Sequence, residues 1–174
     1  VIPAPAFDPE IVLQTIEAER CTAVHGVPTM FIAELRHPNF SKYDIRSLRT
    51  GIMAGSPCPI ESMKEVASKM HMSEVVIVYG QTELSPGVTM TTTKDPLEKR
   101  VTTVGRVFPH TELKIIDAET KKTLPRGEIG EICARGYMTM RCYYNSPTAT
   151  RQTKDENGWI HTGDLGSFDP EGYV

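Results

Sequence analysis

Helical and strand-like segments alternate along the first half of the chain, and this alternation constrains the fold more than any other feature. Asp8 followed by Pro9 is a typical helix start, and an apolar stripe of helical spacing continues to about Glu19. A second helix is predicted to begin at Pro28 and to be closed by Pro38, a third helix at about 60–70, and strands at 22–24, 47–55 and 75–78. Such alternation is typical of βαβ units, so we predict an α/β fold that contains part of a doubly wound, largely parallel sheet.

The pattern changes at about residue 101, where closely spaced strand-like segments separated by short turns begin. A polar crossing segment, 89–100, precedes them, and within this half only 147–153 is helical in pattern. Strands are predicted at 111–116, 128–135, 138–144 and from residue 172 onward. We therefore predict a partial α/β subdomain over residues 1–100 and a smaller antiparallel, barrel-like β subdomain over residues 101–174.

Composition restricts the classes of function. Hydrophobic residues make up 39% of the chain and charged residues 24%, and the net charge is -3. These values are ordinary for a globular domain and argue against disorder and against a basic nucleic-acid-binding surface. The chain has no apolar run of the roughly 20 residues that span a bilayer and no signal-peptide pattern. We therefore expect no nucleic-acid partner, no transmembrane segment, and a location in the cytoplasm, or in the mitochondrial matrix if the source is eukaryotic.

The four cysteines and five histidines show no metal-binding or catalytic spacing. Cys21, Cys58, Cys133 and Cys142 form no CxxC pair and lie near no His pair at zinc spacing. We expect four reduced thiols and a reducing compartment. The histidines form no triad and no HxxxH pattern, and isolated histidines are more often structural than catalytic.

A polar cluster, Tyr79-Gly80-Gln81-Thr82-Glu83, follows the strand predicted at 75–78. A glycine there lets the backbone turn sharply or approach a ligand, a threonine hydroxyl can bond a phosphoryl oxygen, and a carboxylate suits Mg²⁺. Tyr79 offers a flat face on which a base can stack. The alternative is a helix N-terminus with Thr82 as its cap and Glu83 in its first turn. In parallel sheets ligands bind beyond the carboxyl ends of strands, and both this cluster and the segment 54–57 lie at such ends.

Two glycine-rich segments in the second half are further candidates. In 158–164, Asp164 could accept hydrogen bonds from a ribose diol. The alternative there is a hairpin in which Asp164 caps a turn and Trp159 packs in the core. The glycines of 127–136 suggest a phosphate loop, but the segment lacks the Lys-Ser/Thr ending of a P-loop and alternates like a strand, so a strand is favoured.

Taken in order, five segments resemble the AMP-forming adenylating enzymes, a superfamily that includes acyl-CoA synthetases, firefly luciferase and peptide-synthetase adenylation domains. The segments are AGSP (54–57), YGQTE (79–83), VGRVFPHTELKIID (104–117), GEIGEICARG (127–136) and GWIHTGDLG (158–166). They cover nearly the whole chain, and VPTMF and CARGYMTM are most similar to medium- and long-chain fatty-acyl-CoA synthetases. The resemblance implies that ATP activates a fatty acid to an acyl-adenylate with release of pyrophosphate, and that CoA then displaces AMP. The resemblance is also compatible with a homodimer of the parent enzyme.

The resemblance implies roles for individual residues. Tyr79 would stack on adenine, Thr82 would hold the α-phosphate, Glu83 would bind Mg²⁺, and Asp164 would bind the ribose hydroxyls. Thr82 and Glu83 are thus the expected catalytic residues. The nucleotide site would be completed by Ala54, Gly55, Ser56, Pro57, Gly80 and Gln81, and the acyl pocket would be bordered by Ala54, Gly80, Gln81, Pro86 and Gly87.

The sequence also departs from the superfamily pattern. It lacks the Gly/Ser/Thr-rich phosphate loop, the hinge, the Arg that follows the ribose-binding Asp and the catalytic Lys of the mobile C-terminal domain. Cys142 stands where the family usually has Gly, which predicts a strained or rearranged turn. We therefore expect an internal fragment of a longer enzyme that by itself binds nucleotide weakly and catalyses nothing. The alternatives are an aryl or amino-acid adenylating enzyme, a non-catalytic nucleotide-binding module, and an unrelated Rossmann-like protein, which here would lack its GxGxxG motif.

Overall fold

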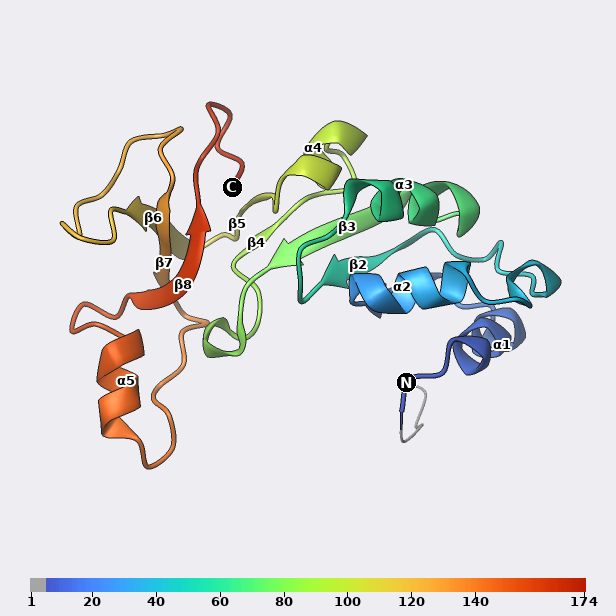
Figure 1. Cartoon of the computed structure of the whole chain (residues 1–174), viewed down its shortest axis with the longest axis horizontal. Coiled ribbons are helices and arrows are strands. Elements are labelled where there is room, and N and C mark those ends of the chain that lie inside the picture. Colours follow the sequence, from blue (N-terminus) through green and yellow to red (C-terminus); the bar gives the residue numbers. More distant parts are fainter. Residues whose placement is uncertain (1–5) are drawn as a thin grey trace. The chain divides into compact units, whose positions relative to one another are not determined.

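A computed structural model describes residues 6–174, which form two compact units (Figure 1). The first unit comprises residues 6–77 and Thr92–Thr102, and the second comprises Val78–Thr91 and Thr103–Val174. The units are therefore interleaved along the sequence, because the chain enters the second, returns to the first and enters the second again. The proposed division of the parent protein at residue 100 stays a prediction.

The first unit contains the predicted alternation of helices and strands. Its elements are α1 (Pro9–Glu19), β1 (Ala23–Gly26), α2 (Pro28–Leu35), β2 (Thr50–Ala54), α3 (Ile60–Lys69), β3 (Glu74–Tyr79) and α4 (Leu97–Thr102), with a 3-10 turn at Phe40–Lys42. The predicted start of α1 is confirmed, because the Asp8 carboxylate accepts hydrogen bonds from the backbone N–H groups of Glu10 and Ile11.

The strands of the first unit run parallel, as the alternation predicted. β1 pairs in parallel with β2, from Ala23 opposite Thr50 to Gly26 opposite Met53. β3 is the next strand in the sheet, and its start lies beside the start of β2, since the Glu74 N–H donates to the Arg49 carbonyl at 2.9 Å. β2 and β3 point the same way in Figure 1. The core between the sheet and the helices consists mainly of fully buried Leu13, Phe31, Met53, Met63, Val66, Met70, Met72 and Val75.

The second unit is antiparallel. β3 enters it at Val78 and pairs antiparallel with β4 (Thr89–Met90), which pairs antiparallel with β5 (Arg106–Val107). A separate sheet has the order β6 (Thr111–Ile116), β7 (Gly130–Gly136) and β8 (Ile160–Gly166), and α5 (Pro147–Thr153) precedes β8. Its apolar cluster consists of Leu84, Val88, Ala134, Met138 and Ile160, with Leu113 and Met140 packed against it.

The predicted antiparallel β subdomain is confirmed, but its expected barrel-like shape is wrong, because β6, β7 and β8 form an open, three-stranded sheet. Two predicted strands did not form. Residues 138–144 run as turns and irregular chain, in which the Thr139 N–H donates to the Gly136 carbonyl. Val174 exchanges backbone hydrogen bonds with Val104 and Gly105 but extends no strand. With so few strands the sheet cannot close on itself.

The predicted polar crossing segment 89–100 is also wrong in part, because it contains β4 and most of α4. Thr89 and Thr91 are fully buried, and the Thr89 hydroxyl donates to the Val104 carbonyl at 2.7 Å. Within residues 6–174, no helix has both the length and the apolar character that a bilayer crossing requires. The four cysteines carry free thiols: Cys133 is buried, Cys142 is exposed, and Cys21 and Cys58 are half-buried.

Candidate functional site

The polar cluster after β3 lies in a loop that reverses the chain. Val78 pairs with Met90 and Tyr79 with Thr89, and the Val88 N–H donates to the Tyr79 carbonyl at 2.8 Å, so residues 80–88 connect two antiparallel strands. A 3-10 turn, Thr82–Leu84, occupies the middle of this loop, and fully buried Leu84 anchors it in the apolar cluster. The alternative of a helix capped by Thr82 is wrong, since Gln81 precedes a single turn and no side chain caps it.

Tyr79 and Asp164 are brought into contact by the fold, although 85 residues separate them. The half-buried Tyr79 hydroxyl donates a hydrogen bond of 2.8 Å to Oδ2 of Asp164, whose side chain is exposed. Burial raises the pKa of the Tyr79 phenol well above its ordinary value of 10, and the contact with Asp164 raises it further. Tyr79 therefore stays neutral, with an aromatic ring beside a carboxylate.

Asp164 owes its position to a bulge in β8. Cys133 pairs with His161 and Glu131 with Leu165, so that 162–164 lie opposite Ile132 alone. Gly163 has a φ of 74°, a left-handed value that favours glycine. The Thr162 hydroxyl donates to the Ile132 carbonyl at 2.7 Å and accepts from the Asp164 N–H at 3.1 Å, which holds the bulge.

The alternative interpretation of Asp164 as the cap of a hairpin turn is wrong. Asp155 has that role, since its Oδ1 accepts from the N–H groups of Asn157 and Trp159, each at 2.9 Å. Trp159 is half-buried outside the apolar cluster, where Lys114 and Arg135 lie over its ring at 4.2 and 4.7 Å from the centroid.

Glu83 is held by a residue that sequence reasoning missed. Tyr143 donates a hydrogen bond from its hydroxyl to Oε1 of Glu83, and this bond raises the pKa of the Tyr143 phenol. The Met140 N–H donates to the Glu83 carbonyl at 2.8 Å. Because a carboxylate has about four lone-pair positions, Glu83 keeps acceptor capacity for a cation. The neighbouring Thr82 is exposed. No local pattern marks Tyr143 as a partner of Glu83, because the two residues lie 60 positions apart and 138–144 has the composition of a strand.

Cys142 lies two positions after Met140 in the same loop. The φ angle of Cys142 is not positive, whereas that of Asn145 is 51°. The strain predicted for a non-glycine residue at this position is thus not seen as a left-handed φ, and the predicted rearrangement of the turn stays a prediction.

Three of the residues predicted for an acyl pocket pack against one another. A Cβ atom on Gly80 would lie 1.9 Å from the Pro86 carbonyl oxygen and 2.8 Å from the Gly87 Cα. Gly87 is buried and packs against Phe108. A Cβ atom on Gly87 would lie 2.9 Å from the Phe108 ring. The glycines thus allow the two ends of the 80–88 loop to touch.

The segment 54–57 forms a turn at the carboxyl end of β2, in the first unit. Gly55 has a φ of 86°, while Ser56 and Pro57 are exposed. The Cys58 thiol donates to the carbonyls of Met53 at 3.7 Å and Ser56 at 3.5 Å, which closes the turn before α3. A glycine is required at position 55 because other residues rarely adopt this φ.

A cavity of about 460 Å³ in the first unit contains none of the predicted site residues. Apolar side chains of α1 and β1 form much of its wall, and Glu34 of α2 reaches it. Both carboxylate oxygens of Glu34 are buried, and neither has a hydrogen-bond partner among residues 6–174. Burial raises the pKa of Glu34 to about 7.

The contact between Tyr79 and Asp164 can be tested by Tyr79→Phe, which removes the hydroxyl and keeps the ring. We expect a loss of about 1 kcal/mol in the free energy of unfolding, measured by urea denaturation. Tyr144→Phe is the matched control, because Tyr144 is 90% exposed and should change nothing measurable. Equal stability of the two variants would mean that the hydrogen bond is not formed in solution.

Comparison with proteins of known sequence agrees with these motifs. The family model described as AMP-binding enzyme matches residues 1–144. The Bacillus subtilis protein YngI, named as a candidate acyl-CoA synthetase, is 53% identical over 173 residues, which cover 99% of this chain and 32% of YngI. The mitochondrial medium-chain acyl-CoA ligase ACSF2 of Rattus norvegicus is 40% identical over 173 residues, or 99% of this chain and 28% of that protein.

Comparison with solved structures shows the same fold. ATP-bound MatB from Rhodopseudomonas palustris superposes with a TM-score of 0.81 at 31% identity, over 98% of this chain and 33% of MatB. The chain thus spans about a third of the length of each of these proteins. The matched family model covers most of the chain and includes the 54–57 and 79–83 segments, and the predicted resemblance is confirmed. The chain belongs to the AMP-binding enzyme family.

Proposed function

We propose that this chain forms the central part of an AMP-forming acyl-CoA ligase. In that reaction ATP and a fatty acid give an acyl-adenylate and pyrophosphate, and the CoA thiol then displaces AMP. The observation that carries the proposal is the hydrogen bond between Tyr79 and Asp164. An aromatic face for a base and a carboxylate for ribose hydroxyls then lie side by side, next to a loop that bears Thr82 and Glu83.

Each residue has a proposed part in binding ATP. The Tyr79 ring would stack on adenine, with the turn of Ala54, Gly55, Ser56 and Pro57 against the base and Gly80 and Gln81 beside it. Asp164 would accept hydrogen bonds from the ribose hydroxyls, which would compete with the Tyr79 hydroxyl for Oδ2. The Thr82 hydroxyl would donate to the α-phosphate. Glu83, held by Tyr143, would bind Mg²⁺.

The proposed chemistry suits these side chains. Attack of a substrate carboxylate on the α-phosphorus depends mainly on positioning and on charge neutralisation. Bound Mg²⁺ would offset the negative charge of the phosphates. Thr82 and Glu83 would orient the α-phosphate and the cation, and no residue of the site needs to form a covalent bond with the substrate.

The substrate is proposed to be a medium- or long-chain fatty acid. Support comes from the relative named medium-chain acyl-CoA ligase and from the apolar surroundings of the 80–88 loop. Ala54, Gly80, Gln81, Pro86 and Gly87 would border the acyl chain. We further propose that the phosphate loop, the hinge and the catalytic Lys are contributed by other parts of a longer protein, which acts in the cytoplasm or the mitochondrial matrix and could form a homodimer.

A chimera tests the proposal. Residues 1–174 would replace the matching segment of rat ACSF2, and ATP–pyrophosphate exchange would be measured with fatty acids of graded length. We expect exchange above that of a no-acid control, and none from residues 1–174 alone. A folded chimera that binds AMP but never exchanges pyrophosphate would contradict the proposed reaction. Robust exchange by the isolated chain would contradict its proposed dependence on further parts.

Glu83→Gln in this chimera should lower the exchange rate about 100-fold, the usual cost of losing one group that stabilises transition-state charge. The amide oxygen can still accept from Tyr143, so the loop should keep its structure while the charge is lost. Raised Mg²⁺ should recover part of the rate. The control is Glu128→Gln, an exposed glutamate remote from the loop in sequence, which should leave exchange unchanged. Equal rates for the two variants would exclude a catalytic part for Glu83.

A further inference from the structure

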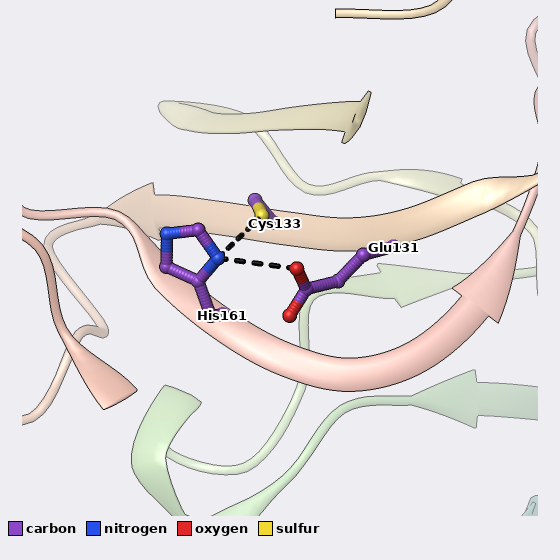
Figure 2. A group of neighbouring side chains, drawn as sticks. All are labelled: Glu131, Cys133 and His161. Carbon is purple, nitrogen blue, oxygen red and sulfur yellow. Dashed lines mark hydrogen bonds and ion pairs between the residues drawn. The ribbon is translucent and has the colours of Figure 1, made fainter. Parts of the chain in front are cut away.

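Three side chains that can bind a metal lie together on one face of the β6–β7–β8 sheet (Figure 2). Glu131 and Cys133 are two residues apart on β7, and His161 lies opposite Cys133 on β8. Residues two apart on a strand share a face, and cross-strand partners lie side by side, so the strand register produces the cluster. None of the three belongs to the proposed ATP site.

The distances within this Glu131–Cys133–His161 cluster match those of a tetrahedral metal site. Nδ1 of His161 lies 3.6 Å from Sγ of Cys133 and 3.2 Å from Oε2 of Glu131, and the ligand atoms all lie within 4.8 Å of one another. Zinc bonds of about 2.0–2.1 Å to nitrogen and oxygen and about 2.3 Å to sulfur imply N–O and N–S separations of about 3.3 and 3.6 Å. The side chains therefore need little movement to bind an ion.

A single proton cannot satisfy both contacts of Nδ1 well, because the nitrogen either donates or accepts and the Cys133 sulfur is only a weak acceptor. If Nδ1 carries a hydrogen, it can donate to Glu131, but the Cys133 thiol then has no acceptor on the ring. If Nδ1 is unprotonated, it can accept from the thiol, but the Glu131 oxygen then faces a lone pair. A cation at the centre of the cluster would satisfy the nitrogen, the sulfur and the oxygen at once.

The surroundings support a metal-binding role for the ring. Nε2 of His161 lies 3.9 Å from Oδ2 of Asp155, and metal-bound histidines commonly direct their other N–H to a carboxylate. Oε1 of Glu131 accepts from the Gly163 N–H at 3.3 Å, which leaves Oε2 on the side of the ring. Lys121 lies 3.7 Å from Oε2, but its side chain is 60% exposed and can turn into solvent when a cation binds.

A nucleophilic role for Cys133 is disfavoured. Cys133 is fully buried, and burial raises the pKa of its thiol to about 11. An uncomplexed thiolate is therefore rare at neutral pH, and a substrate cannot reach the sulfur. A small ion can approach along His161 and Glu131, whose side chains are 25% and 14% exposed.

We propose that Glu131, Cys133 and His161 bind one divalent transition-metal ion of the zinc class. The ligands are the Cys133 thiolate, Nδ1 of His161 and one Glu131 oxygen, with water in the fourth position. The thiol proton is released to solvent when the metal–sulfur bond forms. Thiolate and imidazole ligands favour Zn²⁺ or Co²⁺ over Mg²⁺, so this site differs in chemistry from the proposed Mg²⁺ site at Glu83.

Co²⁺ titration of the chain tests the proposal. The starting protein carries Cys21→Ser, Cys58→Ser and Cys142→Ser, so that Cys133 is its remaining thiol. We expect one Co²⁺ per chain, a thiolate-to-cobalt charge-transfer band, and loss of the band when Zn²⁺ is added. Cys133→Ser in this background should remove the band, and Asp155→Asn should weaken Zn²⁺ binding about 10- to 100-fold.

Circular dichroism at each step separates loss of the site from loss of the fold. If the Cys133→Ser protein does not fold, His161→Gln and Glu131→Gln replace it, and each should weaken Zn²⁺ binding at least tenfold. The absence of a charge-transfer band in the folded starting protein would overturn the proposal. Unchanged Zn²⁺ affinity in the folded ligand variants would do the same.

Discussion

Replacing Gly80 with alanine is expected to destabilise the second unit by about 3 kcal/mol or more, a large value for a single added methyl group. The new Cβ would lie 1.9 Å from the Pro86 carbonyl oxygen and 2.8 Å from the Gly87 Cα. Both neighbours are backbone, so no side-chain rotation can relieve the clash. The loop must open, which would break the hydrogen bond from the Val88 N–H to the Tyr79 carbonyl.

Gly26→Ala is the matched control. Gly26 also lies at a strand end and has no positive φ, but its Cβ would meet only side-chain atoms, at 3.4 Å from Phe31 and 3.5 Å from Met30. This substitution should change stability by less than about 1 kcal/mol, and can stabilise by reducing the entropy of the unfolded chain. Urea denaturation of both variants measures the difference between their free energies of unfolding. Similar midpoints would show that the 80–88 loop is not packed as described.

Glu34→Gln is expected to stabilise the chain by up to about 3 kcal/mol above pH 7 and to change little at pH 4. Glu34 is 1% exposed, and within the part of the chain that the structure describes neither of its carboxylate oxygens has a hydrogen-bond partner. Desolvation raises its pKa from the ordinary 4.5 to about 7. At about 1.4 kcal/mol for each pH unit, this difference corresponds to about 3 kcal/mol. Glutamine has nearly the same shape but no charge to desolvate.

The direction of the pH effect follows from proton binding. Between pH 4.5 and 7 the folded chain keeps the Glu34 proton while the unfolded chain loses it, so the folded state binds more protons. The contribution of Glu34 to the free energy of unfolding therefore falls as pH rises through this range and is constant above it. Glu34→Gln removes this contribution.

Urea denaturation of both proteins from pH 4 to 8 measures the effect. The two stabilities should coincide at pH 4 and separate progressively to about pH 7. Glu61→Gln, on an exposed face of α3, is the control and should give curves parallel to those of the parent chain. A constant difference between the Glu34→Gln protein and the parent chain would contradict the raised pKa.

Local pattern was sufficient for the first half of the fold. The cap at Asp8 followed by Pro9, the apolar stripe of α1 and the short apolar strands predicted α1, α2, α3 and the parallel pairing. Local sequence pattern did not predict elements that are very short or that need a pairing partner distant in the sequence. β4 has two residues and α4 has six. Such short elements contain too few residues to show the hydrophobic period of a strand or a helix. The segment 138–144 has strand-forming residues but no neighbouring strand to pair with.

For the candidate site, too, the sequence predicted the individual residues but not the contacts between them. Residue type and position after a strand were enough to single out Tyr79, Thr82, Glu83 and Asp164, and a strand followed by Gly55 was enough to predict a turn. No local pattern could predict that the Tyr79 hydroxyl bonds Asp164, or that Tyr143 holds Glu83 from 60 residues away. Those contacts depend on the antiparallel return of the 80–88 loop and on the bulge at Gly163.

The amino-acid order alone thus determined the helix and strand periodicity, the family motifs and the polar groups at strand ends, because these depend on neighbours within one or two turns of chain. Tertiary structure decided which distant groups meet. Cys133 and His161 are 28 residues apart and show no metal-binding spacing, yet strand register makes them partners. Register arises from the packing of a whole sheet face and from one bulge, and a shift by one residue would move each of these side chains to the opposite face.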